Sequence, residues 1–399
     1  MKKINKNSLT FFFVMIFMFA GLCGKSFQTI IGTAEGALND ISHGNFSKLI
    51  SYENSVNEAT NSDLIYHDSL VGVNSIKENL LGTRVVFKND MTVVKADSER
   101  LVDTTPKMTN ETLINAISKI CELKTVAENN NAHFLYCATL KKSYYETYPD
   151  NVEDFYKENY RVFIDKIEKS HIDYLELRNM LNDIEKSGEN RYFNSDHHWT
   201  PYAAFKATGT ICKALNEKFG FIYNKDYVDI NYYEVKTYNN WFLGSLGKKT
   251  GQFFSWNGAD DFDVFTPLFQ TDLISEEPFK NESRSGEFSD TVLHLDNLKK
   301  DYYSVNTYSV YNGGNYRLQI ISNKLNPNGK KILLIGDSFD CAVVPFLSLQ
   351  TSQLHICDVR NMKGLVGEKV NIKNYIEEIR PDYVLVLYAD IQDDNFDFF

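Results

Sequence analysis

The feature that most constrains the fold of this chain is a short aliphatic run, Ile332–Ile335, that leads directly into Gly336-Asp337-Ser338-Phe339. An apolar run of this length before a turn is typical of a strand buried on both faces of a parallel sheet. Ser338 would then lie just beyond the carboxyl end of that strand, at the edge where open α/β sheets bind their ligands. A serine at this place also has a simpler interpretation, as the N-cap of a tight strand-to-helix turn.

A second short stretch, Asp196-His197-His198-Trp199, supplies the side chains that a reactive serine needs. A hydroxyl is a poor nucleophile until a base takes its proton, and a carboxylate must fix the tautomer and orientation of that base. In an extended segment residues two apart point the same way. We therefore expect Asp196 and His198 to share a face while His197 points elsewhere. Adjacent histidines in a loop are also compatible with a structural or metal-binding role.

Apolar runs and amphipathic segments alternate over most of the chain, which predicts a parallel sheet with helices on both faces. Strands are expected at 133–137, 172–176, 332–335, 354–357 and 383–387, and helices at 111–128, 152–169, 201–219, around 343–346, and at 372–380. Thr200 and Pro201 are the expected N-cap and first residue of the third helix. Residues 222–325 lack long helical periodicity and predict a β-rich insertion. The segment 84–94 predicts a hairpin that turns at Asn89-Asp90.

The first 24 residues predict an export signal. Lys2, Lys3 and Lys6 precede an apolar run from Leu9 to Leu22. The length of this run lies between a signal-peptide core and a full membrane span. Leu22 stands before Cys23, where a lipoprotein signal would have a small residue, so we favour an uncleaved signal anchor over a cleaved signal peptide. Either way the basic end stays inside and the remainder is exported. The expected location is the outer face of the cell membrane, or the exterior after cleavage.

The predicted organisation is therefore a targeting segment at 1–24, a lead region of uncertain fold at 25–105, and a catalytic domain at 106–399. The chain has 399 residues and a formal net charge of −11 without a sustained basic tract, which argues against a nucleic-acid partner. Its six cysteines include no CxxC pair, so beyond the targeting segment we expect buried thiols and no metal site. Cys341 is a rival nucleophile by position, but it has no base of its own.

Together, Tyr192–Pro201 and Ile335–Phe339 resemble the DHHW family of SGNH-type proteins, which is similar to the alginate-type exopolysaccharide O-acetyltransferases. The resemblance continues through Trp241–Gly247, Tyr311–Gly314 and Asp358–Arg360. Typical SGNH hydrolases carry the serine block first and the Asp-His block last. The order is reversed here, which implies a permuted SGNH-like α/β sheet with the same site geometry. Different chain orders around one triad are known to be tolerated.

The resemblance implies an acyl-transfer enzyme that uses a serine nucleophile and no cofactor. His198 would accept the proton of Ser338, Asp196 would orient the imidazole, and Ser338 would attack an acetyl donor. The acetyl-serine would then pass its acetyl group to a hydroxyl of a polysaccharide. The backbone N–H of Ser338 is expected to stabilise the tetrahedral intermediate, and one such donor contributes about 2.7–4 kcal/mol.

Four further residues are candidates for the oxyanion or substrate site. The resemblance points to Arg360 as a second oxyanion element, although a salt bridge with Asp358 explains this arginine equally well. Asn315 is a weaker candidate that also fits a turn. His197 and Trp199 are expected as walls of the site, where the tryptophan would exclude water, stack on a sugar ring, or simply pack.

Three other functions remain open at this point. An acetyl esterase shares the acyl-serine and differs only in using water for deacylation, so fold and triad do not separate the two. A metal-dependent phosphoesterase would need further Asp or His motifs, and the patch Asp260-Asp261-Asp263 reads as a solvated loop instead. A silent polysaccharide-binding protein would not require a complete Ser-His-Asp set.

The expected location also carries a requirement for a partner. An exported transferase has no acetyl-coenzyme A on its side of the membrane. The resemblance therefore implies a multi-pass membrane-bound O-acyltransferase that supplies acetyl groups to Ser338.

Overall fold

The computed structural model describes residues 67–88, 91–362 and 370–391, together with Gly36, Asp40 and Phe396. The expected targeting segment lies outside these residues, as does the proposed hairpin turn at Asn89-Asp90. The chain divides into two compact units, residues 1–80 and 81–399. In the first unit, helix α4 spans His67–Leu80. Among the described helices, none combines the length and the apolar character needed to cross a membrane.

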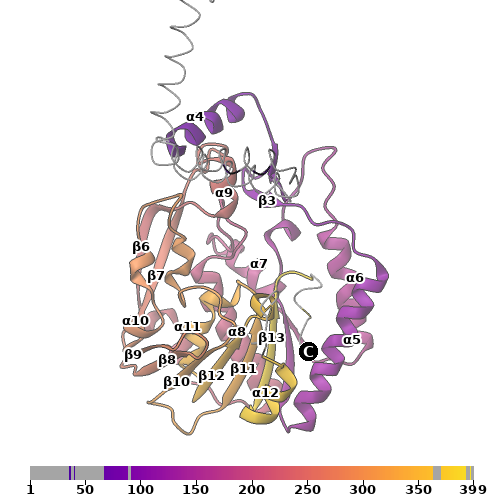
Figure 1. Ribbon diagram of the computed structural model, residues 1–399, viewed down its shortest axis with the longest axis vertical. Coiled ribbons are helices and arrows are strands. Elements are labelled where there is room, and N and C mark those ends of the chain that lie inside the picture. Colours follow the sequence, from indigo (N-terminus) through magenta and orange to yellow (C-terminus); the bar gives the residue numbers. More distant parts are fainter. Residues whose placement is uncertain are drawn as a thin grey trace, which may run out of the picture. The chain divides into compact units, whose positions relative to one another are not determined.

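The second unit contains an eight-stranded sheet with the order β5-β4-β13-β11-β12-β10-β8-β9 (Figure 1). Its strands are β4 (His133–Ala138), β5 (Tyr174–Glu176), β8 (Leu273–Glu277), β9 (Glu282–Gly286), β10 (Gln319–Asn323), β11 (Lys331–Gly336), β12 (Gln353–Cys357) and β13 (Tyr383–Tyr388). The first five strands in the sheet order are parallel. The pairings of β12 with β10, β10 with β8, and β8 with β9 are antiparallel. The predicted parallel sheet is thus confirmed for five strands, and the β-rich insertion extends it with three antiparallel ones.

Helices cover both faces of this sheet, as predicted. Helix α5 contacts α6 and α12, while α8 contacts α7 and α11 (Figure 1). The helices of this unit are α5 (Asn110–Asn129), α6 (Tyr156–Lys169), α7 (Arg178–Lys186), α8 (Pro201–Phe219), α9 (Ser245–Thr250), α10 (Phe288–Thr291), α11 (Val344–Ser348) and α12 (Ile372–Ile379). Helix α8 begins as its sequence predicts, because the Thr200 side chain accepts the Ala203 N–H and Pro201 occupies the first position. Helix α7 was not predicted.

The chain also forms two smaller sheets, one before the large sheet in sequence and one between its strands β5 and β8. The predicted hairpin is present as β1 (Val85–Lys88) and β2 (Met91–Lys95), which pair antiparallel, and β3 (Leu101–Asp103) adds a third strand. The insertion also contains a two-stranded ribbon of β6 (Tyr233–Phe242) and β7 (Asp260–Pro267). This ribbon contributes to the candidate site.

The carboxyl ends of four parallel strands meet at one edge of the large sheet. Strand β11 lies between β13 and β12, and its residues Ile332–Ile335 are fully buried, which places it at the centre of the core. Beyond its end comes Ser338. Beyond the ends of β4, β13 and β12 come, in turn, Lys141, Asp390 and Arg360. Open α/β sheets bind their ligands at this edge.

Candidate active site

Asp196, His198 and Ser338 lie in one hydrogen-bonded series. His198 Nε2 is 2.7 Å from Ser338 Oγ, and His198 Nδ1 is 2.5 Å from Asp196 Oδ1. Asp196 and His198 are buried, whereas Ser338 is partly exposed. These are the contacts that an activated serine makes with a base, and that the base makes with the acid that orients it. The structure therefore brings together the three side chains selected from the sequence.

A tight loop, and not an extended strand, presents Asp196 and His198. Tyr192 and Trp199 pair as an isolated antiparallel bridge, and Phe193 N–H donates to the His198 carbonyl at 3.2 Å. The residues between them, here called the histidine loop (residues 193–198), cannot follow strand alternation. The expectation that His197 points away from His198 is wrong for this reason, since the centroids of the two rings are 3.9 Å apart.

Asp196 is held in its charged form by its surroundings. Burial raises the pKa of this carboxyl, but His197, His198 and the N–H of Ser245 lower it more, to well below its ordinary value. The Ser245 N–H donates to Asp196 Oδ2 at 2.5 Å. A charged Asp196 can fix the tautomer of His198 and stabilise an imidazolium.

His197 lines the same site but makes different contacts. Its Nδ1 lies 3.0 Å from Ser245 Oγ. Burial and the neighbouring His198 lower the pKa of His197 to about 4, so its ring is neutral at neutral pH. His197 is among the residues that line the cavity next to Ser338.

The serine turn (residues 336–340) is fixed by Asp337 and Gly336. The Asp337 carboxylate accepts from Phe339 N–H at 3.0 Å and from Ala389 N–H at 2.9 Å, which joins the ends of β11 and β13. A Cβ on Gly336 would lie 2.2 Å from Asp340 Oδ2, so a side chain at this position requires Asp340 to move. The turn thus depends on its own residues and on the end of the neighbouring strand β13.

Trp199 ties the histidine loop to the serine turn, but it is not a wall of the cavity. Its side chain is fully buried, and its Nε1 donates to the Phe339 carbonyl at 3.0 Å. The expectation of a water-excluding or sugar-stacking surface is therefore wrong, and the packing alternative is correct. A ring that sequence reasoning missed, Tyr308, stacks on His198 with centroids 4.1 Å apart.

Arg360 forms a salt bridge with Asp358, as in the second of its two interpretations from the sequence. Its Nε and one terminal nitrogen bind the two oxygens of Asp358 at 2.9 and 2.7 Å. The guanidinium nevertheless also lines the cavity that contains Ser338. Asn315 lies behind this pair and donates to Asp358 Oδ2 at 3.1 Å, and it is not among the residues that line the cavity. Asn315 therefore contacts the partner of Arg360, Asp358, from outside the cavity.

Cys341 is buried, and its thiol is poorly suited to be the nucleophile. Burial, together with the carboxyl groups of Asp340 and Asp358, raises the pKa of this thiol well above its ordinary value. Its Sγ contacts Asn315 Oδ1 at 3.6 Å. Because the thiolate is the reactive form, this environment favours Ser338.

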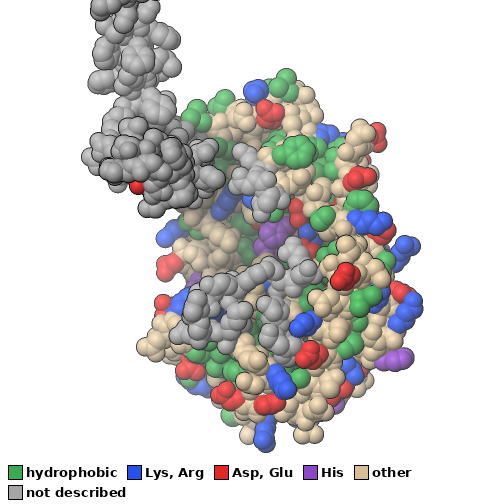
Figure 2. Space-filling view, turned by 45° about the vertical axis from the view of Figure 1, so that its right-hand side comes forward, with side chains coloured by type: hydrophobic (Ala, Val, Ile, Leu, Met, Phe, Trp, Pro, Cys, Tyr) green, Lys and Arg blue, Asp and Glu red, His purple; other side chains and the backbone are tan. Residues whose placement is uncertain are grey.

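A cavity of about 160 Å³ adjoins Ser338. It is lined by charged groups of both signs and a few apolar side chains: Met91, Asp103, Lys141, His197, Leu246, Asp337, Ser338, Phe339, Arg360, Ala389 and Asp390. Lys141 forms ion pairs with Asp103 at 2.8 Å and with Asp390 at 3.2 Å. Charged side chains of both signs are also interspersed over the face seen in Figure 2, where histidine is visible near the centre.

Donor atoms of Asp196, His197 and His198 lie within 4.8 Å of one another, a spacing that a metal ion could use. Each of these side chains already makes a specific contact, with Ser245 or with a member of the Ser338 series. A metal ion would have to break the bond between His198 and Asp196 or Ser338. The observed contacts favour acyl-transfer chemistry over metal binding.

Sequence reasoning missed the contribution of the insertion to the site. Besides Ser245, Gly244 packs against Asp196, because a Cβ on Gly244 would lie 2.1 Å from Asp196 Cβ. Both residues belong to Trp241–Gly247, a string that the family resemblance includes without indicating its role. The signal was present, but only the folded chain shows what it contacts.

Comparisons with known proteins agree with the observed fold. Residues 127–232 match the family model described as ALGX, the SGNH hydrolase-like domain of the acetyltransferase AlgX. A search of curated proteins found no match. Among solved structures, PatB1 from Bacillus cereus with a sulfonyl adduct superimposes with a TM-score of 0.62 and 18% identity, covering 79% of this chain and 99% of the other. A DHHW family protein from Eubacterium siraeum gives a TM-score of 0.56 and 18% identity, with 78% and 96% covered. Residues 127–232 are therefore similar to the SGNH hydrolase-like domain of AlgX, and the fold of the chain is similar to those of PatB1 and a DHHW family protein.

Proposed function

We propose that this protein is a serine acyl-transfer enzyme that moves acetyl groups onto a polysaccharide. One observation carries the proposal: the series Ser338–His198–Asp196, with contacts of 2.7 and 2.5 Å, at the carboxyl edge of a parallel sheet. The match of residues 127–232 to an acetyltransferase domain supports the same chemistry.

The proposed reaction has two acyl-transfer steps. His198 Nε2 takes the proton of Ser338 Oγ as this oxygen attacks the carbonyl carbon of an acetyl ester, and the departing alcohol oxygen receives that proton. The acetyl group is then an ester of Ser338. In the second step His198 takes the proton of an acceptor hydroxyl, whose oxygen attacks the acetyl-serine, and the proton returns to Ser338.

The negative charge of the tetrahedral intermediate needs donors that are already in place. Within the described part of the chain, the backbone N–H of Ser338 donates to no protein acceptor, and it is our first candidate for a donor to the intermediate. Arg360 is the second candidate because its guanidinium lines the same cavity. Its bidentate contact with Asp358 would hold it at a fixed orientation.

The volume beside Ser338 supports a small acyl group. A cavity of about 150 Å³ holds one benzene molecule, so the observed space of about 160 Å³ is large enough for an acetyl group. The acceptor would approach from solvent, since Ser338 is partly exposed.

We further propose that the protein acts outside the cytoplasm, held at the membrane by its N-terminal segment. A membrane-bound O-acyltransferase would supply the acetyl groups. Transfer to sugar is favoured over hydrolysis by the similarity to an acetyltransferase domain. The nearest competing function is an acetyl esterase, which would use the same residues with water as the acceptor.

The proposal is tested by incubating the purified protein with 4-nitrophenyl acetate and a sugar oligomer. We expect release of 4-nitrophenol and an oligomer heavier by one acetyl group in mass spectrometry. The serine should also react with phenylmethylsulfonyl fluoride, and peptide mapping should find the adduct on Ser338. Activity that disappears with EDTA and returns with zinc would support the metal alternative. Removal of acetyl from acetylated glycan without any transfer would support the esterase.

A further inference from the structure

A buried lysine, Lys142, forms hydrogen bonds with the carbonyl groups of the histidine loop. Its Nζ donates to three backbone carbonyls of the loop, those of Phe193 at 2.9 Å, Asn194 at 3.1 Å and Asp196 at 2.5 Å. Lys142 follows strand β4 and opens a short 3-10 helix. An ammonium group has three N–H donors, and here each has a different loop carbonyl as its acceptor.

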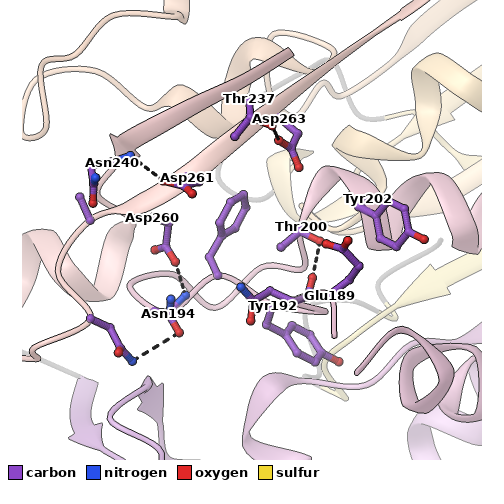
Figure 3. A pocket seen from close by; sticks show the side chains of 14 residues that line it. Glu189, Tyr192, Asn194, Thr200, Tyr202, Thr237, Asn240, Asp260, Asp261 and Asp263 are labelled. Atoms are coloured by element: carbon purple, nitrogen blue, oxygen red, sulfur yellow. Dashed lines mark hydrogen bonds between the residues drawn. The ribbon is translucent and has the colours of Figure 1, made fainter. Parts of the chain in front are cut away.

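A buried carboxylate, Asp260, holds the same loop through its N–H groups. It accepts from Asn194 N–H at 2.6 Å, from Ser195 N–H at 2.8 Å and from the Ser195 hydroxyl at 2.5 Å. Figure 3 shows the Asp260 carboxylate, at the start of β7, directed toward Asn194. Only 6% of Asp260 is exposed, so the interpretation of this position as part of a solvated loop is wrong.

The two charged side chains supply hydrogen-bond partners for backbone groups of this loop. Apart from the bond between Phe193 N–H and the His198 carbonyl, the loop's carbonyl and N–H groups do not pair with one another as they would in a helix or sheet. A buried polar group without a partner is costly. A buried lone charge is costly as well. Lys142 and Asp260 attract each other, which reduces that cost for both. The loop is therefore fixed by a cation on its carbonyls and an anion on its N–H groups.

We propose that Lys142 and Asp260 are positioning residues that set the place of Asp196 and His198 relative to Ser338. Neither side chain lines the cavity beside Ser338, so neither is expected to touch the reacting acetyl group. Asp260 lines a separate pocket (Figure 3). Their effect would pass through the loop that they hold. A displacement of about 1 Å at a reacting centre lowers the rate about 100-fold. The inference rests on the proposed function of Ser338 and His198.

This inference also assigns a role to the β-rich insertion. Asp260 lies on its two-stranded ribbon, and Gly244 and Ser245 follow the other strand of that ribbon. All three contact the histidine loop, since Gly244 N–H donates to Ser195 Oγ at 2.8 Å and Ser245 N–H donates to Asp196. The insertion is thus a support for the acid-base pair and not only an extension of the sheet.

The test compares the full chain carrying Asp260→Asn or Lys142→Met with two control variants. Asp261→Asn is the control for Asp260→Asn, because Asp261 is the next residue and is exposed. Lys213→Met is the control for Lys142→Met, because Lys213 is an exposed lysine on α8. We expect kcat for 4-nitrophenyl acetate to fall about 10–100-fold in the first pair. KM should stay within about twofold, because substrate contacts are retained. Sulfonylation of Ser338 should slow by the same factor as kcat, and the controls should match the wild type.

Three further outcomes separate the possible failures. If Ser338→Ala is as active as the wild type, the proposed function is wrong, whatever the loop variants do. If Ser338→Ala is inactive but Asp260→Asn and Lys142→Met turn over like their controls, the positioning inference is wrong. Should either variant fail to fold, Ser195→Ala removes one contact with Asp260 and should still lower kcat at unchanged KM; an unchanged kcat in that variant also overturns the inference.

Discussion

The serine turn and the histidine loop are held in place by different forces. The turn follows β11, whose residues Ile332–Ile335 are fully buried between β13 and β12. Asp337 completes the turn from within, and Trp199 and Ala389 add one hydrogen bond each. The histidine loop has no regular structure of its own and depends on polar contacts from residues distant in sequence, above all Lys142, Ser245 and Asp260. Apolar packing fixes the nucleophile, whereas a few hydrogen bonds fix its base. Single polar substitutions should therefore disturb the base far more than the nucleophile.

The largest effect is expected from the nucleophile itself. Ser338→Ala should lower kcat by at least about 10⁴-fold, because the acyl-enzyme cannot form. The melting temperature should stay close to that of the wild type, since Ser338 is partly exposed and its strand is unchanged. Adding His198→Ala should produce little further loss, as expected for residues that act as a unit. Additive losses in the double variant would show that the two side chains act independently.

A smaller but still large effect is expected from Gly244→Ala, on the histidine-loop side. The new Cβ would lie 2.1 Å from Asp196 Cβ and 2.6 Å from its Cα, so the loop must move. We expect kcat to fall about 100-fold. Gly209→Ala, on helix α8, is the matched control, because the nearest atom to its new Cβ would be the Val228 Cβ at 3.4 Å. Wild-type kcat in Gly244→Ala would mean that the position of Asp196 is not critical.

The equivalent change in the serine turn, Gly336→Ala, should lower kcat less than Gly244→Ala does. A second substitution at Asp340 should restore kcat. Its Cβ would meet the tip of the Asp340 side chain at 2.2 Å, and Asp340 Oδ2 has no hydrogen-bond partner among the described residues. We expect a loss of about 10-fold in kcat, since the displaced group is not part of the series with His198. Gly336→Ala combined with Asp340→Gly, which removes Oδ2, Cγ and the Cβ at 2.9 Å, should regain most of this activity. No recovery would show that the turn is as sensitive as the loop.

Arg360→Lys tests whether the guanidinium contributes beyond its salt bridge. Lysine keeps the positive charge but loses the planar fork that binds both oxygens of Asp358. We expect kcat to fall about 5–10-fold, less than the loss of a dedicated oxyanion donor, with little change in melting temperature. A melting temperature that falls together with activity would assign Arg360 to structural support alone.

The smallest expected effect is a pH dependence that arises from Lys142. Burial lowers its pKa from 10.5 to about 8, although Asp260, Asp196, Glu146 and Asp103 act to raise it. Because this pKa is lower in the folded state, the contribution of Lys142 alone makes folding more favourable as pH rises from 8 to 10.5. Activity should nevertheless fall several-fold above about pH 8, since a neutral amine has two donors for three carbonyls. The decline should be absent in Lys142→Met; the same decline in that variant would assign the pH dependence to another group.

The elements that were predicted correctly are those whose signals are local. Strands β4, β11 and β13 are visible as apolar runs of a few residues. Helices α5 and α8 are visible as an apolar periodicity over a few turns. The predicted direction of His197 was wrong because strand alternation applies only to an extended chain. Helix α7 was missed, and Trp199 was placed in the cavity although its side chain is buried in the core.

The sequence by itself determined which residues carry the proposed chemistry, because Ser338 follows an unmistakable buried strand and Asp196 and His198 stand two residues apart. It also determined the parallel core, since a continuous apolar run is typical of a strand that is buried on both faces of a sheet. Only the tertiary structure decided how the acid-base pair is held. Lys142, Ser245 and Asp260 come from three separate segments and meet the histidine loop through directional hydrogen bonds. Hydrophobic burial is non-directional and can be read from a local pattern. Hydrogen bonds between distant segments depend on where the folded backbone places each donor and acceptor, and that placement has no local pattern.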